Sequence, residues 1–105
     1  MIIPDDIPST TLCRLALMEG ILIAAATGDS PDNHIYEHLR RVFMADPGVR
    51  DLLPPFVKTY RNLDAFWPYI KHRARTYAER REIISLAFNP LMDRLEGGTA
   101  RRVTR

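Results

Sequence analysis

A run of apolar residues near the start of the chain limits the folds that this sequence can adopt. Twelve of the fifteen residues from Leu12 to Ala26 are apolar. A membrane-spanning helix needs about 20 apolar residues. An export signal begins with positive charge, whereas Asp5 and Asp6 precede this run and Glu19 interrupts it. We therefore predict a central helix that the rest of a soluble domain, or a second chain, buries on most sides.

Length and composition predict one ordinary globular domain. The chain has 105 residues, of which 46% are hydrophobic and 27% are charged, and these values argue against global disorder. Cys13 is the single cysteine, so neither an intramolecular disulfide nor a multi-cysteine zinc site can form. Its place in the apolar run predicts a small buried residue. We expect a cytoplasmic protein with one helical domain over residues 1–98.

Turn residues divide the chain into helical segments. Apolar residues recur at helical spacing, and no segment alternates with period two for long enough to predict a strand. Gly28 can adopt the left-handed conformation that ends a helix. Helices are predicted at 9–27, from 32 or 33 to about 45, at 62–75 and at 76–96, with short helical pieces between 49 and 60. The predicted fold is all-α, a compact bundle of four to five helices, followed by a flexible basic tail at 99–105.

The last two predicted helices carry capping residues and apolar stripes. Asn62 is a good N-cap, and Thr76 and Glu79 have capping-box spacing. Arg81 falls on the inward side of its helix, so we expect it to pair with a carboxylate such as that of Asp64 or Glu82. The predicted core residues are Leu63, Phe66, Trp67, Ile70 and Ala74 in the first of these helices, and Tyr77, Ile84, Phe88, Leu91 and Leu95 in the second.

Positive charge is concentrated in the second half of the chain. Residues 1–60 carry a net charge of −3 and residues 61–105 a net charge of +5. This density could bind phosphates, and Trp67, Tyr69 and Tyr77 could stack on bases. Solvated helix faces are also commonly charged, and Trp67 and Tyr77 lie on apolar stripes that favour a core position. The candidate anion-binding residues are Lys71, Arg73, Arg75, Arg80, Arg101 and Arg102.

One short motif suggests a metal, but the rest of the sequence does not support it. His34 to His38 reads H-x-x-E-H, which places two histidines one turn apart on a helix, as in inverted zinc proteases. A working site needs a third ligand and a larger scaffold, so a surface histidine pair is the simpler interpretation. Glycine-rich phosphate loops and nucleophile elbows are missing from the sequence. We expect no cofactor and no catalytic activity.

Several segments together resemble a known bacterial module. They are Leu52 to Trp67, Ile70 with Lys71, Thr76 to Arg81 and Pro90 to Glu96, with a looser match at Ile35 to Arg41. These segments resemble the amino-terminal module of bacterial abortive-infection family proteins, over about 45 residues. In that family a larger carboxy-terminal domain follows, to which the defence function is attributed, whereas this sequence ends at Arg105. The resemblance transfers no catalytic residue.

The sequence leaves three classes of function open. The first is a non-catalytic interaction module of a phage-defence system that binds another protein chain or a second copy of itself. The apolar first helix, with Leu17, Ile21 and Ala24, would supply that surface. The alternative is a nucleic-acid-binding module that uses the basic face at residues 71–81. The third class, a metal-dependent hydrolase built on His34 and His38 with Glu37, predicts bound zinc.

Overall fold

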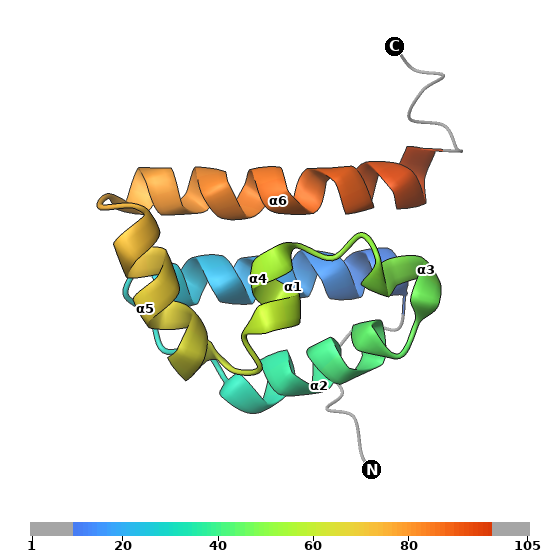
Figure 1. The fold of residues 1–105 in the computed structure, drawn as a ribbon, viewed down its shortest axis with the longest axis horizontal. Coiled ribbons are helices and arrows are strands. Elements are labelled where there is room, and N and C mark those ends of the chain that lie inside the picture. Colours follow the sequence, from blue (N-terminus) through green and yellow to red (C-terminus); the bar gives the residue numbers. More distant parts are fainter. Residues whose placement is uncertain (1–9, 98–105) are drawn as a thin grey trace.

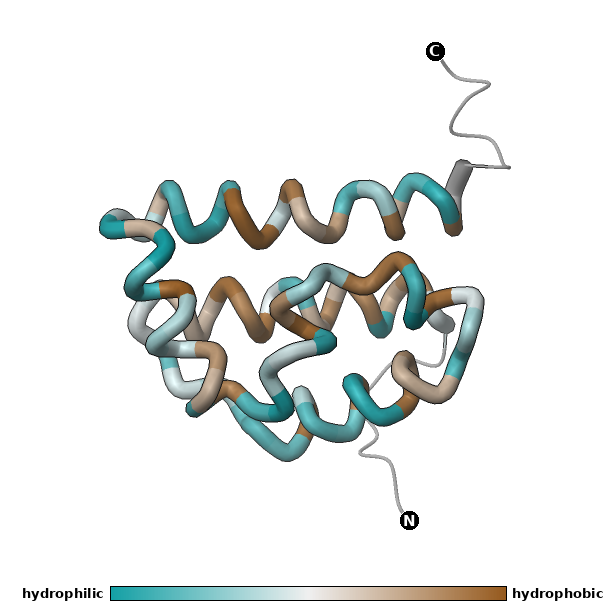
Figure 2. The backbone as a smooth tube through the Cα atoms, viewed as in Figure 1, coloured by the Kyte–Doolittle hydropathy of each residue, from teal (hydrophilic) through white to brown (hydrophobic). Residues whose placement is uncertain are grey.

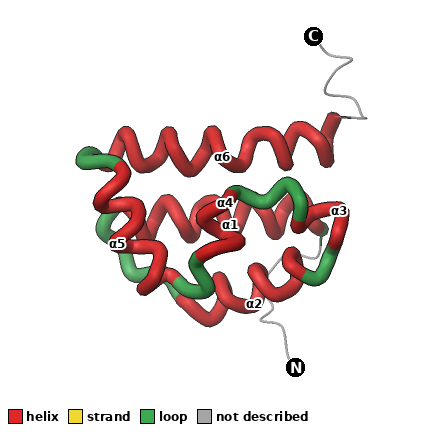
Figure 3. The backbone as a smooth tube through the Cα atoms, in the orientation of Figure 1, coloured by secondary structure: helices red, strands yellow, loops and turns green. Residues whose placement is uncertain are grey.

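The computed structural model describes residues 10–97. All regular structure in this range is helical (Figure 3), which confirms the predicted all-α fold class. None of these helices is long and apolar enough to span a membrane. The predicted basic tail, with Arg101 and Arg102, lies outside the described residues. The helices are α1 (Thr11–Ala26), α2 (Asn33–Met44), α3 (Pro47–Arg50), α4 (Pro55–Thr59), α5 (Leu63–Arg73) and α6 (Tyr77–Gly97).

The first helix is the centre of the bundle. In Figure 1, α1 runs between α6 on one side and α2 on the other, and α5 closes one end. Figure 2 shows that hydrophobic residues gather along α1 in the middle of the molecule. Leu15, Met18, Leu22 and Ala26 have no exposed surface, because they recur at the spacing of a single helix face. The apolar run therefore forms the predicted central buried helix.

Side-chain caps define where the helices begin. The side chains of Thr10, Asp32, Asp46 and Asn62 accept hydrogen bonds from backbone N–H groups in the first turns of α1, α2, α3 and α5. At the start of α6, the Glu79 N–H donates to Thr76 Oγ1 over 3.1 Å. The predicted caps at Asn62 and Thr76 are confirmed.

Glycine is required at the end of α1. Gly28 has a φ of 102°, in the left-handed region predicted for it. The Asp29 N–H donates to the Ala24 carbonyl over 2.9 Å, the long bond of a Schellman motif. The Tyr77 hydroxyl would lie 2.9 Å from a Cβ at position 28. Strain at this φ disfavours a larger residue here, and the exposed Tyr77 side chain would have to shift to admit one.

Most predicted core positions are buried, but several individual predictions were wrong. Tyr77 is 49% exposed and Leu95 is 37% exposed, although both lie on the apolar stripe of α6. Trp67 is half-buried and packs against the core, so its predicted core position is correct in part. Cys13 is exposed because it is two positions from Leu15, about 200° around the helix.

One large core residue was missed. Tyr36 has no exposed surface, and its hydroxyl donates to the Tyr60 carbonyl over 2.9 Å. An aromatic residue with a polar hydroxyl can enter a core when that hydroxyl finds a partner. The hydropathy pattern of α2 gives no sign of the partner, because it lies 24 residues away.

Candidate functional site

The basic segment singled out by the sequence contains one buried cation. Arg80 is 8% exposed. Its Nε donates to the Ala74 carbonyl and its Nη1 to the Ala26 carbonyl, each over 3.0 Å. These carbonyls end α5 and α1, where no intrahelical donor is available. The prediction that Arg80 is a surface ligand for anions is therefore wrong, because its guanidinium group joins two helix ends inside the protein.

The aromatic residues beside Arg80 are occupied by cations. The guanidinium carbon lies 5.4 Å from the Trp67 ring centroid and 5.5 Å from the Tyr77 ring centroid. Lys71 Nζ also lies 5.4 Å from the Trp67 ring, within the range of a cation–π contact. Arg81 was predicted to point inward but is exposed. Arg80 is the residue that points inward, and the next residue lies about 100° further around the helix. Trp67 and Tyr77 therefore have a structural role, and their rings are less available to stack on bases.

The other predicted cations near the end of α5 are exposed. Lys71, Arg73 and Arg75 lie on the surface, and Lys71 and Arg73 belong to the last turn of α5, where positive charge is favourable. The Glu79 carboxylate caps the start of α6 and forms no ion pair with these side chains. Its Oε1 accepts from the backbone N–H groups of Thr76 and Arg75, and these bonds lower the pKa of its carboxyl group.

One face of α2 holds the segment that leads into α5. Asn33 Oδ1 accepts from the Leu63 N–H over 2.8 Å, and Tyr36 binds the Tyr60 carbonyl. Arg40 Nε donates to the Val57 carbonyl over 2.8 Å, and its Nη2 donates to the Lys58 carbonyl over 2.7 Å. Asn33, Tyr36 and Arg40 are spaced i, i+3 and i+7, on one side of the helix. Residues 57–63 are consequently fixed in position against α2.

The segment held by α2 borders a hollow lined by aromatic and basic residues. We call it the tyrosine hollow; it has a volume of about 580 Å³ and is lined by Tyr60, Pro68, Tyr69, His72 and Arg73. The Tyr60 and Tyr69 rings lie 5.2 Å apart between centroids. Tyr69 also contacts the rings of Phe56 and Phe66 in the core. Neither a site role for Tyr60 and His72 nor the pairing of the two tyrosines was predicted from the sequence.

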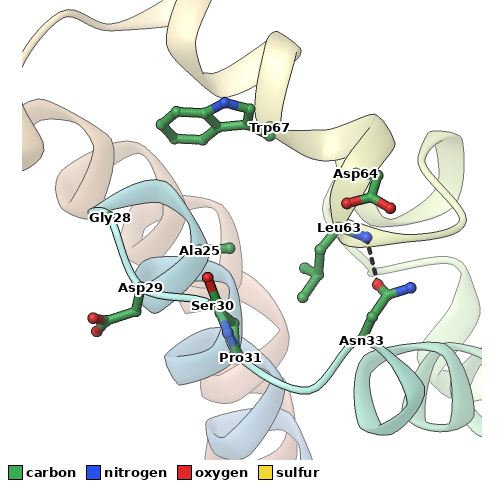
Figure 4. A pocket seen from close by; sticks show the side chains of 9 residues that line it. All are labelled: Ala25, Gly28, Asp29, Ser30, Pro31, Asn33, Leu63, Asp64 and Trp67. Atoms are coloured by element: carbon green, nitrogen blue, oxygen red, sulfur yellow. Dashed lines mark hydrogen bonds between the residues drawn. The ribbon is translucent and has the colours of Figure 1, made fainter.

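A second hollow has the opposite charge. It lies between the loop after α1 and the start of α5, has a volume of about 360 Å³ and includes Trp67, Asp29 and Asp64 in its lining (Figure 4). The hydrogen bond from the Leu63 N–H to Asn33 crosses its edge. Because carboxylates repel phosphates, this hollow is a poor site for an anionic partner.

The histidine motif does not form a metal site in the described residues. The His34 side chain is 92% exposed, and its Nδ1 lies 3.9 Å from Glu37 Oε1. Both ring nitrogens of His38 are buried and have no hydrogen-bond partner. No group of three histidine, cysteine, aspartate or glutamate side chains in the described part of the chain could hold a metal ion. The zinc alternative therefore gains no support from the geometry.

The surface predicted for self-association is not available on α1. Ile21 is 8% exposed and belongs to the core. Leu17 and Ala24 are partly buried, since α5 and α6 pack against this helix. Large exposed hydrophobic residues instead occur on α6, where Leu86 is 59% exposed.

Comparisons with known proteins do not add a family. No protein-family model, curated protein or solved structure matches this chain. The function is therefore inferred from the residues and their geometry.

Proposed function

We propose that this chain is a non-catalytic helical binding module whose partner is a single-stranded nucleic acid. The observation that carries the proposal is the convergence of Tyr60, Tyr69, His72 and Arg73 on the tyrosine hollow. Tyrosine rings provide platforms on which bases stack, and neighbouring cations neutralise the phosphates. The exposed Lys71 and Arg75 extend the positive charge along the same end of α5.

An unpaired strand fits this hollow better than a duplex does. In a duplex the flat faces of the bases are covered by their neighbours, so tyrosine rings cannot stack on them. The Tyr69 ring is held by packing against Phe56, Phe66 and Tyr60, and the Tyr60 backbone is held by the hydrogen bond from Tyr36. A preorganised aromatic surface loses little conformational entropy when a base binds. The net charge of +5 over residues 61–105 favours an anionic partner of this kind.

A role in phage defence is part of this proposal. It is supported by the resemblance of residues 52–67 and 76–81 to the amino-terminal module of abortive-infection proteins. A cytoplasmic location follows from that role, because phage nucleic acid is accessible there. Plaque counts on cells that express the gene, compared with cells that express a tyrosine-hollow variant, would test this part.

Binding can be tested with the whole chain. We expect a fluorescein-labelled single-stranded DNA of about ten nucleotides to bind with an affinity that falls steeply as salt increases. Changing both His72 and Arg73 to alanine should weaken binding by about tenfold. Adding Tyr60→Leu to this double variant should weaken binding further, because one stacking ring is removed. Arg81→Ala is the matched control, because Arg81 is exposed and lies outside the hollow.

Two results would show that the proposed function is wrong. If the strand does not bind the wild-type chain at low salt, the proposed function is wrong. It is equally wrong if Arg81→Ala and the His72 and Arg73 double variant lose the same affinity, because the binding would then follow net charge alone. Preferential binding of a proline-rich peptide would identify the hollow as a peptide site instead.

A second candidate function is self-association through α6. Leu86 borders a hollow of about 640 Å³ whose rim carries Arg73, Arg75, Glu79 and Glu82. Because both signs of charge surround one exposed apolar side chain, two copies related by a two-fold axis could pair arginine with glutamate. Light scattering at several concentrations tests this idea. A dimer that Leu86→Lys converts to a monomer would support it, and a monomer at all concentrations would exclude it.

A further inference from the structure

A further hollow lies beside the segment that α2 holds. We call it the arginine hollow; it has a volume of about 320 Å³ and is lined by Arg40, Arg41, Arg61, Glu37 and Asn62. Two of its arginines come from α2, and the third comes from the segment before α5. Arginine guanidinium groups bind phosphate through paired N–H donors. The arrangement is therefore suited to a phosphate group.

Arg40 is already ordered in this hollow. Its Nε and Nη2 are used by the carbonyls of Val57 and Lys58, and Nη1 has no such bond to those carbonyls. The side chain is held at two points, so a ligand would not have to order it. These bonds also end the short helix α4 with a positive charge at its carboxyl end, which is stabilising.

Three arginines and one carboxylate line the hollow, so positive charge is in excess there. Among residues 10–97, none of the three guanidinium groups forms an ion pair with a carboxylate. The Glu37 carboxylate is directed toward the start of α2, where Oε2 accepts from Asn33 Nδ2 over 3.1 Å and Oε1 lies 3.9 Å from His34 Nδ1. Three like charges at one site repel one another unless an anion lies between them. This unbalanced cluster points to an anionic ligand.

The position of Arg61 links this hollow to the tyrosine hollow. Tyr60 lines one hollow, and Arg61, the next residue, lines the other. Their Cα atoms are about 3.8 Å apart, as in any trans peptide. The backbone on both sides of Arg61 is fixed, at the Tyr60 carbonyl by Tyr36 and at the Leu63 N–H by Asn33. A strand with a base on Tyr60 would therefore bring a phosphate close to Arg61.

We infer that Arg40, Arg41 and Arg61 bind a phosphate group, and that this group is a backbone phosphate of the strand whose base contacts Tyr60. The second half of the inference rests on the proposed function. The first half does not, because a free phosphate or pyrophosphate presents the same oxygens to the same arginines. The chemistry is the same for both sources, and the experiment separates them.

The experiment compares two double variants of the full chain. In one, Arg41 and Arg61 become alanine; both are exposed, so folding is not expected to change. In the charge-matched control, Arg50 and Arg81 become alanine; both lie outside the arginine hollow. Affinity for the labelled single strand is measured over a range of salt, and pyrophosphate is titrated while NMR signals of the arginine Nε–H groups are followed.

The Arg41 and Arg61 variant should bind the strand about tenfold more weakly than the control variant. The slope of log affinity against log salt should become shallower by about 0.7 for each phosphate that the variant no longer neutralises. Pyrophosphate should shift the signals of Arg40, Arg41 and Arg61 and should compete with the strand.

Each remaining outcome has a definite meaning. If strand binding depends on His72 and Arg73 but the two double variants behave alike, the proposed function stands and this inference fails. If the strand does not bind but pyrophosphate shifts the three arginine signals, the phosphate site stands and its assignment to a strand fails. If neither ligand distinguishes the Arg41 and Arg61 variant from the control, the arginine hollow binds no phosphate and the inference is overturned.

Discussion

Arg80 Nη1 donates a hydrogen bond to the Ala26 carbonyl over 3.0 Å, across 54 positions of sequence. The same guanidinium group binds the Ala74 carbonyl through Nε. One side chain therefore ties the end of α1 to the end of α5 at the point where α6 begins. Positive charge is favourable at both helix ends, because unpaired carbonyl groups gather there.

Removing this connection should destabilise the fold strongly. We expect Arg80→Ala to lower the free energy of unfolding by about 3 kcal/mol, since two charge-assisted bonds are removed and two buried carbonyls are left without a partner. Arg80→Lys should cost less than alanine but more than a surface change, because an ammonium group cannot reproduce the planar fork. Urea unfolding measures both. Arg81→Ala is the control and should change stability by less than about 0.5 kcal/mol; an equal loss in the two alanine variants would contradict the structural role of Arg80.

Tyr36 should make stability depend on alkaline pH. Burial raises the pKa of Tyr36 from 10.0 to about 12, although the Arg40 guanidinium group acts in the opposite direction. The folded state holds this proton more tightly than the unfolded state does. The stabilisation is therefore fully present below pH 10.0 and is lost as the pH rises through about 12.

The matched variants for this test are Tyr36→Phe and Tyr77→Phe. The first removes the titrating hydroxyl and its bond to the Tyr60 carbonyl, and it should cost about 1 kcal/mol at neutral pH. The fall in stability between pH 10.0 and about 12 should also become smaller in this variant. Tyr77→Phe is the control, because it removes a tyrosine hydroxyl from a side chain that is 49% exposed. Urea unfolding over this pH range would disprove the assignment if both variants behaved alike.

The sequence predicted the elements of the fold well because their signals are local. Apolar spacing places the helices, Asn62 and Thr76 cap two of them, and Gly28 ends the first. A stripe drawn from spacing alone cannot show where the neighbouring helix stops. Spacing therefore assigned Tyr77, at the first position of α6, to the core, whereas its side chain is exposed.

The candidate site was less predictable because it depends on contacts between distant segments. Spacing put Arg81 inside and left Arg80 on the surface, and the reverse is true. The two carbonyls that hold Arg80 are backbone groups, which carry no side-chain signal in the sequence. The arginine hollow likewise joins Arg41 to Arg61 only after α2 has bound residues 57–63. Net charge indicated an anionic partner, but it could not say which cations remain free to bind one.

Glu79 should make the fold less stable in acid. Hydrogen bonds from the backbone N–H groups of Thr76 and Arg75 lower the pKa of Glu79 from its ordinary value of 4.5. The unfolded state binds the proton more readily, so the contribution of Glu79 is present above pH 4.5 and is lost as the pH falls through the lower, folded value. Glu79→Ala should therefore destabilise the protein at neutral pH, and the difference from wild type should shrink in acid. Urea unfolding at neutral pH and in acid checks this, with Glu82→Ala as the control. If the stability difference between Glu79→Ala and wild type stayed constant with pH, the explanation would be ruled out.

His38 is a polar side chain that the fold places in a poor environment. Both of its ring nitrogens are buried without a hydrogen-bond partner, and each unsatisfied group of this kind costs free energy. His38→Leu introduces an apolar side chain of similar size and removes the unsatisfied nitrogens, so it should leave stability unchanged or raise it by about 1 kcal/mol. His34→Leu makes the same change at a position with a side chain that is 92% exposed, and it should have little effect. A loss of more than about 1 kcal/mol in His38→Leu, measured by urea unfolding, would mean that the imidazole has a stabilising partner such as a buried water molecule.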